Sequence, residues 1–198
     1  MIQSKIRCQT FCEGLVQEMT MHSSSDAFQS KCLALLVHIF DLPKKSAINA
    51  HLFSKSFIMS GGLGCVVRVI ETFSTDLELQ KLTMQVLARL LKGYIPVDHC
   101  CDRIPAAVVR TMNAFPSDEF IQTSSCYVLL CYSKNDPQRM KHVIAADGLE
   151  ALAKACGNFP HSTKISEATK HLLNHAIVSF YQVFEETRDT KEKEYSTV

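Results

Sequence analysis

One phrase recurs three times along the 198-residue chain, and its spacing limits what the chain can fold into. The copies are "ETFSTDLELQKLTMQVL", "NAFPSDEFIQTSSCYVLL" and "GNFPHSTKISEATKHLL". Their alignment places Phe73, Phe115 and Phe159 in register, 42 and then 44 residues apart. A fainter copy, "SSSDAFQSKCLALL", places Phe28 six residues further along the phrase, where Leu79 stands in the copy that contains Phe73. Self-similarity at about 40 to 47 residues is typical of helical solenoids.

Within each copy the apolar residues follow helical spacing on both sides of a turn. Leu63, Val66, Val67 and Ile70 precede the first turn at intervals of three and four residues. A second stripe follows the turn, and the three turns "FSTD", "FPSD" and "FPHS" supply Ser or Asp residues that can cap the next helix. No segment alternates like a strand, so the sequence predicts an all-α fold.

Each pair of predicted helices is preceded by a shorter element that ends in glycine. "NAHLFSKSFIMSGGLGCVV" reaches Gly62 and "NDPQRMKHVIAADGLEAL" reaches Gly148, where glycine allows a sharp turn. A short helix, a glycine corner and two packed helices resemble the armadillo repeat. The resemblance covers roughly residues 13 to 180, and the Phe-Pro turns resemble those in armadillo regions of leucine-rich-repeat kinases. It implies a right-handed α-solenoid of about four armadillo-like repeats.

The end of the chain differs in composition from the rest. The segment "RDTKEKEYSTV" is charged and lacks an apolar period, which is typical of disorder. The sequence therefore predicts a repeat domain over residues 1–186 and a disordered charged tail over 187–198. Ser196 and Val198 give this tail a resemblance to a class I PDZ ligand, which binds by adding a strand.

Composition narrows the classes of partner and compartment. Hydrophobic residues make up 46% of the chain, charged residues 21%, and the formal net charge is +1. This charge gives no field that would attract nucleic acid or a membrane surface. No secretory signal or membrane span is visible, so we expect a cytoplasmic protein, with the nucleus as an alternative. The nine cysteines are irregularly spaced and mostly lie in apolar phrases, which predicts core residues rather than disulfides.

Catalytic and metal-binding motifs are weak. "MSGGLG" lacks the Lys-Ser/Thr of a phosphate-binding loop, and "VDHCCD", residues 97–102, lacks the Cys and His companions of a zinc site. We therefore predict no cofactor, no metal, no catalytic residue and no enzymatic activity. A metal-binding or enzymatic helical domain stays open as the less favoured alternative, as does a fragment of a larger scaffold or signalling protein.

The prediction for function is a scaffold or adaptor that binds a protein or peptide along the concave face. In importin-alpha-like armadillo proteins that face carries Trp and, four residues later, Asn. The matching pairs here are Ala34 and His38, Gln85 and Arg89, Tyr127 and Cys131, and His171 and His175. Since no Trp or Asn is kept, we expect an acidic or phosphorylated segment in place of a basic one. The predicted partner-binding residues are His38, Gln85, Arg89, Tyr127, Cys131, His171 and His175.

Three further expectations follow from the alignment and the histidines. Leu87, Leu129 and Leu173 occupy equivalent places and are predicted to be buried. The rings of Phe115 and Phe159 are predicted to pack inward at their turns. Because unperturbed histidine titrates near pH 6.5, partner binding is expected to strengthen on mild acidification.

Overall fold

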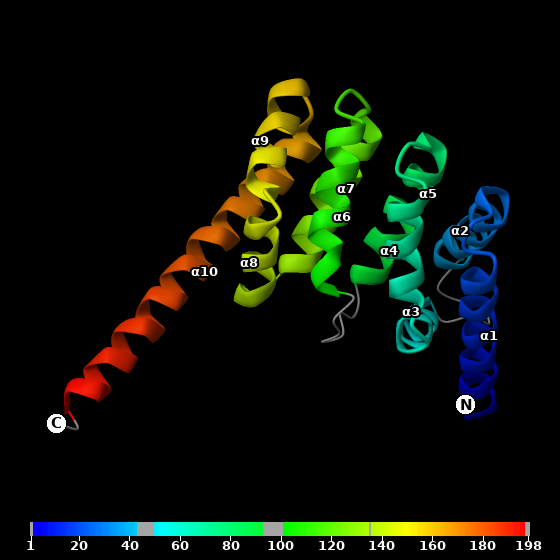
Figure 1. The fold of residues 1–198 in the computed structure, drawn as a ribbon, viewed down its shortest axis with the longest axis horizontal. Helices are drawn as coiled ribbons and strands as arrows, with labels where there is room; N and C mark the ends of the chain where they lie inside the picture. The colour runs from blue at the N-terminus through cyan, green and yellow to red at the C-terminus, as the bar shows by residue number, and fades with distance from the viewer. Residues whose placement is uncertain (1, 43–49, 93–100, 135, 197–198) are drawn as a thin grey trace.

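The computed structural model describes residues 2–42, 50–92, 101–134 and 136–196, and these ranges contain helices and no strand (Figure 1). The predicted all-α class is confirmed. The helices are α1 (Ile2–Met21), α2 (Asp26–Asp41), α3 (Ala50–Met59), α4 (Gly62–Thr72), α5 (Leu77–Leu91), the short 3-10 helix η1 (Cys101–Arg103), α6 (Ile104–Ala114), α7 (Glu119–Ser133), α8 (Pro137–Ala145), α9 (Gly148–Asn158) and α10 (Thr163–Ser196).

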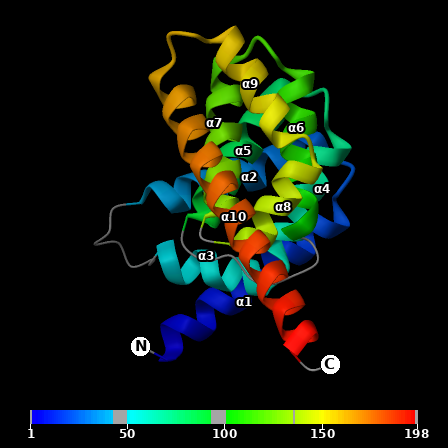
Figure 2. The same ribbon diagram turned by 90° about the vertical axis from the view of Figure 1, so that its left-hand side faces the viewer.

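The helices form four pairs that stack side by side in chain order (Figures 1 and 2). Each pair has a first helix (α1, α4, α6 or α9) and a second helix (α2, α5, α7 or α10). First helices contact first helices along the stack, and second helices contact second helices. The short helices α3 and α8 precede the second and fourth pairs, as the sequence predicts. We call each pair a unit.

The turn inside each unit is built from the repeated phrase. Phe73, Phe115 and Phe159 follow the last residues of α4, α6 and α9, and each backbone N–H donates to the carbonyl four residues earlier. All three rings are half-buried and pack against the core, so their predicted inward packing is confirmed. Ser25, Asp76 and Asp118 then cap the second helices by accepting from the backbone N–H three residues later.

A buried glutamine joins the two helices of the first three units. Gln80 Nε2 donates to the carbonyls of Ile70 at 3.0 Å and Phe73 at 2.9 Å. Gln29 and Gln122 make the same two bonds in their own units, ten and seven residues back along the chain, at 2.8 to 3.0 Å. Carbonyls at a helix C-terminus lack partners within the helix, so this glutamine clamp satisfies groups that the core would otherwise leave unpaired.

The hydrogen-bond partner of the glutamine side-chain oxygen, Oε1, differs between units. Gln80 Oε1 accepts from the Thr111 hydroxyl of the next unit at 2.9 Å. Gln29 Oε1 is buried with no partner in the described part of the chain. The position equivalent to Thr111 is Val69. Its side chain lines the same small hollow as Gln29 and has no hydrogen-bond donor. One missing hydroxyl therefore leaves one buried acceptor unsatisfied.

Substituting Thr111 and Val69 separately should change the free energy of unfolding in opposite directions. Thr111→Val leaves Gln80 Oε1 unpaired and is expected to cost about 1–3 kcal/mol of unfolding free energy. Val69→Thr supplies Gln29 with a donor and is expected to add about 1 kcal/mol. Val67→Thr is the matched control, because Val67 is fully buried and the change adds a hydroxyl away from this acceptor. Urea melts would contradict the account if Val69→Thr destabilised the protein as much as Val67→Thr.

The glycine corners work differently from the sequence prediction. The chain turns at Gly61 and Asp147, whose φ angles are 88° and 58°. Gly62 and Gly148 have ordinary φ angles, but a Cβ at Gly62 would overlap the Phe57 ring, and one at Gly148 would lie 2.6 Å from Val143 Cγ1. The absence of a side chain therefore lets the short helix lie directly against the first helix of its unit.

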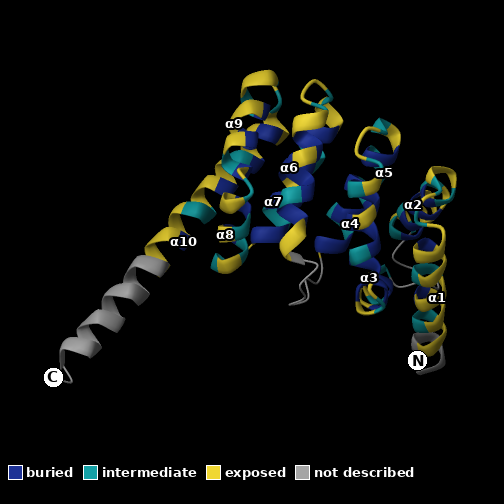
Figure 3. Cartoon of the chain, in the orientation of Figure 1, coloured by how far each residue is buried: buried dark blue, intermediate teal, exposed yellow. Residues whose placement is uncertain are grey.

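The core runs through the whole stack (Figure 3), and two of the three aligned leucines lie in it. Leu87 and Leu129 are fully buried, as predicted. The prediction is wrong for Leu173, which is 44% exposed. In α5 and α7 this position faces the next second helix, and no such helix follows α10 within the described residues.

Alanine substitutions should separate these positions. Leu87→Ala and Leu129→Ala are each expected to cost about 2–5 kcal/mol, the usual range for a buried leucine. Leu173→Ala is expected to change the unfolding free energy of the monomer by less than about 0.5 kcal/mol, the range for surface sites. Equal losses for all three variants in urea melts would show that Leu173 is covered in the free protein.

The end of the chain also departs from expectation. α10 continues as a helix to Ser196, through residues predicted to be disordered. This stretch contains Glu, Lys and Arg, which favour helix, and neither Gly nor Pro to end it. Ser196 is the last helical residue, and Val198 lies outside the described residues.

Most described cysteines lie in or against the core. Cys12, Cys32, Cys65 and Cys126 are buried, and every cysteine whose side chain is described is free. Burial raises the pKa of Cys12 and of Cys126 to about 12. The prediction of core cysteines without disulfides is confirmed for these residues.

No single helix in the described ranges is both long enough and apolar enough to span a membrane. The pair α3 and α4 has the required length and composition, but the two helices are bent by 76° relative to each other.

Candidate functional site

The second helices of the last three units border a groove of about 540 Å³. Its floor is largely apolar, and its walls carry Arg89, Lys164 and His171 together with Glu167. The groove is lined by Gln85, Ala88 and Arg89 from α5, by Phe120, Thr123, Ser124, Tyr127 and Leu130 from α7, and by Lys164, Glu167, Ala168 and His171 from α10.

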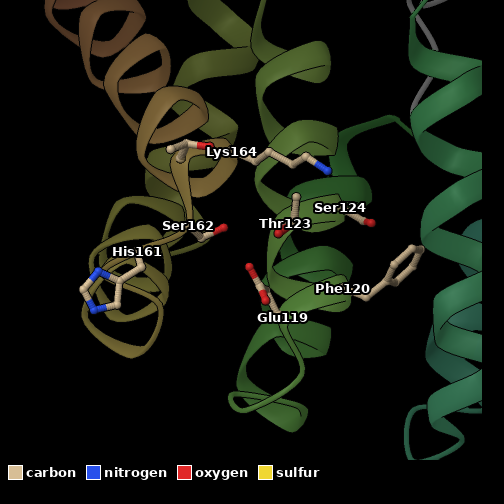
Figure 4. A pocket seen from close by; sticks show the side chains of 8 residues that line it. Glu119, Phe120, Thr123, Ser124, His161, Ser162 and Lys164 are labelled. Carbon is tan, nitrogen blue, oxygen red and sulfur yellow. The ribbon is translucent and has the colours of Figure 1, made fainter.

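A second hollow of about 550 Å³ adjoins the groove at the start of α10 and shares Phe120, Thr123, Ser124 and Lys164 with it. In Figure 4, Lys164 reaches from α10 towards Ser124 on α7. Glu119 and Ser162 face the same gap, whereas Phe120 lies on the other side of α7. Hydroxyl groups, one lysine and the Glu119 carboxylate therefore surround this gap, and the aromatic ring lies on the other side of α7.

The structure brings four of the predicted partner-binding residues together. Gln85, Arg89, Tyr127 and His171 all line the groove. Cys131 and His175 are half-buried one turn further along their helices, outside the lining. His38 is exposed on α2 and also lies outside the groove.

Arg89 is already bonded within the protein. Its Nη2 donates to Asp41 Oδ1 at 2.8 Å and to Oδ2 at 3.0 Å, and its Nε donates to Oδ1 at 3.1 Å. Nη1 donates to the Gln85 carbonyl at 3.2 Å. A bidentate pair of this kind is strong and directional. Arg89 therefore ties α5 to α2 across two units, and its donors are largely used.

Lys164 is the cation that the repeat alignment misses. It is exposed on the first turn of α10, lines both hollows and makes no ion pair with any described residue. Phe120 is also missed, although it is 41% exposed at the start of α7. Both residues lie near the N-termini of their helices, whereas the predicted ladder lies further along. The available signal in the sequence was an aromatic residue two positions after the Asp118 cap.

Tyr127, Cys131 and His175, in or near the groove, have shifted pKa values. Burial raises the pKa of Tyr127, and a hydrogen bond with Cys131 raises it further. Burial also raises the pKa of Cys131, so its thiol is protonated at neutral pH and is a poor nucleophile. Burial lowers the pKa of His175 below 6.5, with His171 and Lys134 adding in the same direction. His175 is therefore neutral at pH 7, and its Nδ1 is buried without a partner among the described residues.

No group of three or more His, Cys, Asp and Glu side chains in the described ranges could hold a metal ion. Of the segment considered for zinc, Asp98, His99 and Cys100 lie outside those ranges. Asp102 is described, and its Oδ1 lies 3.4 Å from His142 Nδ1.

Comparisons with known proteins bear on the fold. No protein-family model matches the chain, and no curated protein matches it. A crystal structure of an engineered protein from the Northeast Structural Genomics Consortium is similar, with a TM-score of 0.64 and 20% sequence identity over 85% of this chain. The chain spans 63% of that engineered protein. At this identity the likeness supports the helical fold alone.

Proposed function

We propose that the chain is a protein-interaction module of the armadillo type, a right-handed solenoid of about four repeats, and acts as a scaffold or adaptor. The observation that carries this proposal is the groove between α5, α7 and α10. It combines exposed apolar side chains, Phe120 and Tyr127, with Lys164, a cation that makes no ion pair with any described residue. Helical repeats commonly use such extended surfaces to bind partner segments.

The groove fits an extended acidic or phosphorylated segment of a protein partner. An apolar side chain of the segment packs between Phe120 and Tyr127, and a carboxylate or phosphate beside it accepts from Lys164. Thr123 and Ser124 offer hydroxyl donors on the same wall. Glu119 and Glu167 restrict where a negative charge can sit, which favours one anionic group close to Lys164 over a long acidic run.

Binding of synthetic peptides tests this function. Short peptides with one apolar residue next to Asp, Glu or phosphoserine should bind saturably in fluorescence anisotropy, and Lys-substituted versions should not. Lys164→Glu should weaken binding by about tenfold or more, since a charged hydrogen bond contributes about 1.5–3 kcal/mol. Tyr127→Ala removes one of the two aromatic rings that hold the apolar side chain, and it should also weaken binding by about tenfold or more. Reversing the charge of Arg89 is less informative. The Arg89→Glu carboxylate would repel Asp41, and this variant is expected to have a lower melting temperature.

The matched control is Lys141→Glu, which reverses an exposed charge on α8 away from the groove. It should bind like the parent, and all three variants should keep the parent melting temperature. Equal binding of acidic and basic peptides, or no effect of Lys164→Glu, would contradict the proposal.

The lowered pKa of His175 should make the stability of the protein depend on pH. Because burial lowers the pKa of His175 in the folded state, the unfolded chain binds this proton more readily, and the free protein should lose stability as the pH falls below 6.5. His175→Gln removes this titration, so the variant should lose less stability than the parent as the pH falls below 6.5. An NMR titration of His175 should give a midpoint below 6.5. A midpoint above 6.5 would contradict this.

A further inference from the structure

The four second helices allow the same position to be compared with different neighbours. In α5 the row Met84, Leu87 and Leu91 is buried. The equivalent rows of α2 and α7 are buried or half-buried: Leu33, Leu36 and Phe40 in α2, and Cys126, Leu129 and Ser133 in α7. In α10 the row is Lys170, Leu173 and Ile177, and all three are exposed.

A second row behaves in the opposite way. Val86, Val128 and Leu172 are fully buried in the last three units, whereas the equivalent residue of the first unit, Leu35, is 40% exposed. The first row therefore faces the following helix, and the second row faces the preceding one. The first row of α10 is exposed because no described helix follows α10. The stack thus ends on a surface of the kind that is buried between its own units.

This surface continues along α10 beyond Ile177. Leu173, Ile177 and Phe180 are 44%, 55% and 71% exposed, and they are spaced by four and three residues. Phe184 follows in the sequence after another four residues. This is the spacing of the apolar seam in a coiled coil. We call Leu173, Ile177 and Phe180 the outward face of α10. Figure 2 looks onto this end of the stack, and in Figure 1 α10 extends past α8 and α9.

We propose that the outward face of α10 is a homodimer interface, in which two copies of the chain pack these faces together about a two-fold axis. The neighbouring exposed residue Tyr181 extends the apolar surface. The contact continues the arrangement inside the stack, where second helices pack against second helices. Two-fold pairing covers both outward faces at once and closes the assembly.

Chemical complementarity favours this pairing over head-to-tail stacking. At the other end of the stack, the outer side of α2 exposes Leu35 between Lys31 and His38. Head-to-tail contact would place a lysine and a histidine against the outward face of α10 and would leave both ends open. Face-to-face pairing of α10 sets Leu173, Ile177 and Phe180 against the same residues of the second copy, with Lys170 at the end of the row.

The interface and the groove use different sides of α10. At 3.6 residues per turn, Lys164, Ala168 and His171 form one stripe, and the outward face lies about 180° around the helix from it. Dimerisation therefore leaves both grooves open, and the inference does not depend on the proposed function. A dimer would hold two grooves in one particle, which strengthens binding to a partner that carries two segments.

Light scattering after gel filtration of the full chain at several concentrations tests the proposal. The parent should have about twice the 22.2 kDa mass of one chain, and its melting temperature should rise with concentration. Ile177→Glu should have the mass of one chain, the parent's far-ultraviolet circular dichroism and a melting temperature independent of concentration. Phe180→Ser changes the most exposed residue of the face without adding a charge to the helix, and it should give the same result.

Two controls separate the alternatives. Leu35→Glu alters the other end of the stack and should keep the dimer mass, and Lys164→Glu alters the groove and should also keep it. A parent of single-chain mass at every concentration would overturn the proposal, as would an Ile177→Glu or Phe180→Ser variant that stays dimeric. Loss of assembly in Leu35→Glu would overturn it in favour of head-to-tail contact.

Discussion

The amide of one buried glutamine connects the two helices of a unit and sets how they cross. Helix C-termini leave carbonyls without partners, and in this stack those carbonyls face the next helix instead of water. Gln29, Gln80 and Gln122 each donate to two of them. Each glutamine stands four residues after its capping Ser or Asp, so the cap, the turn and the clamp form one local device. The unit can repeat because this device depends mainly on residues within a single phrase.

The fourth unit lacks the clamp and is tied together differently. Ser166 occupies the glutamine position, is exposed and is too short to reach the same carbonyls. Cys156 Sγ instead donates to Thr169 Oγ1 at 3.4 Å, between α9 and α10. α10 is then held by its packing on α7, α8 and α9. The loss of the clamp therefore coincides with the end of the stack, where the second helix is also longer than in any other unit.

The sequence predicts what is local and misses what depends on neighbours. The helix class, the inward phenylalanines and the buried Leu87 and Leu129 follow from the repeated phrase alone. Leu173 carries the same phrase, yet its burial depends on a following helix. The Arg89–Asp41 pair joins residues 48 positions apart, so no spacing within a repeat reveals it. Lys164 and Phe120 were missed because the groove forms between helices of different units, which is a property of the stack and not of one helix.

The properties of α10 follow from having neighbours on only some of its sides. Ile165, Ala168 and Leu172 pack inward, Lys164 and His171 line the groove, and Leu173 and Ile177 face away from the stack. In α5 and α7 the outward side is covered by the next unit, so it serves only stability. In α10 the same positions are exposed, and α10 belongs to the one described unit that lacks a glutamine clamp. A partner on the outward face would therefore hold α10 against the stack at the place where internal hydrogen bonding is weakest. Because α10 also forms one wall of the groove, contact on its outward face would steady that wall while leaving its binding side chains free.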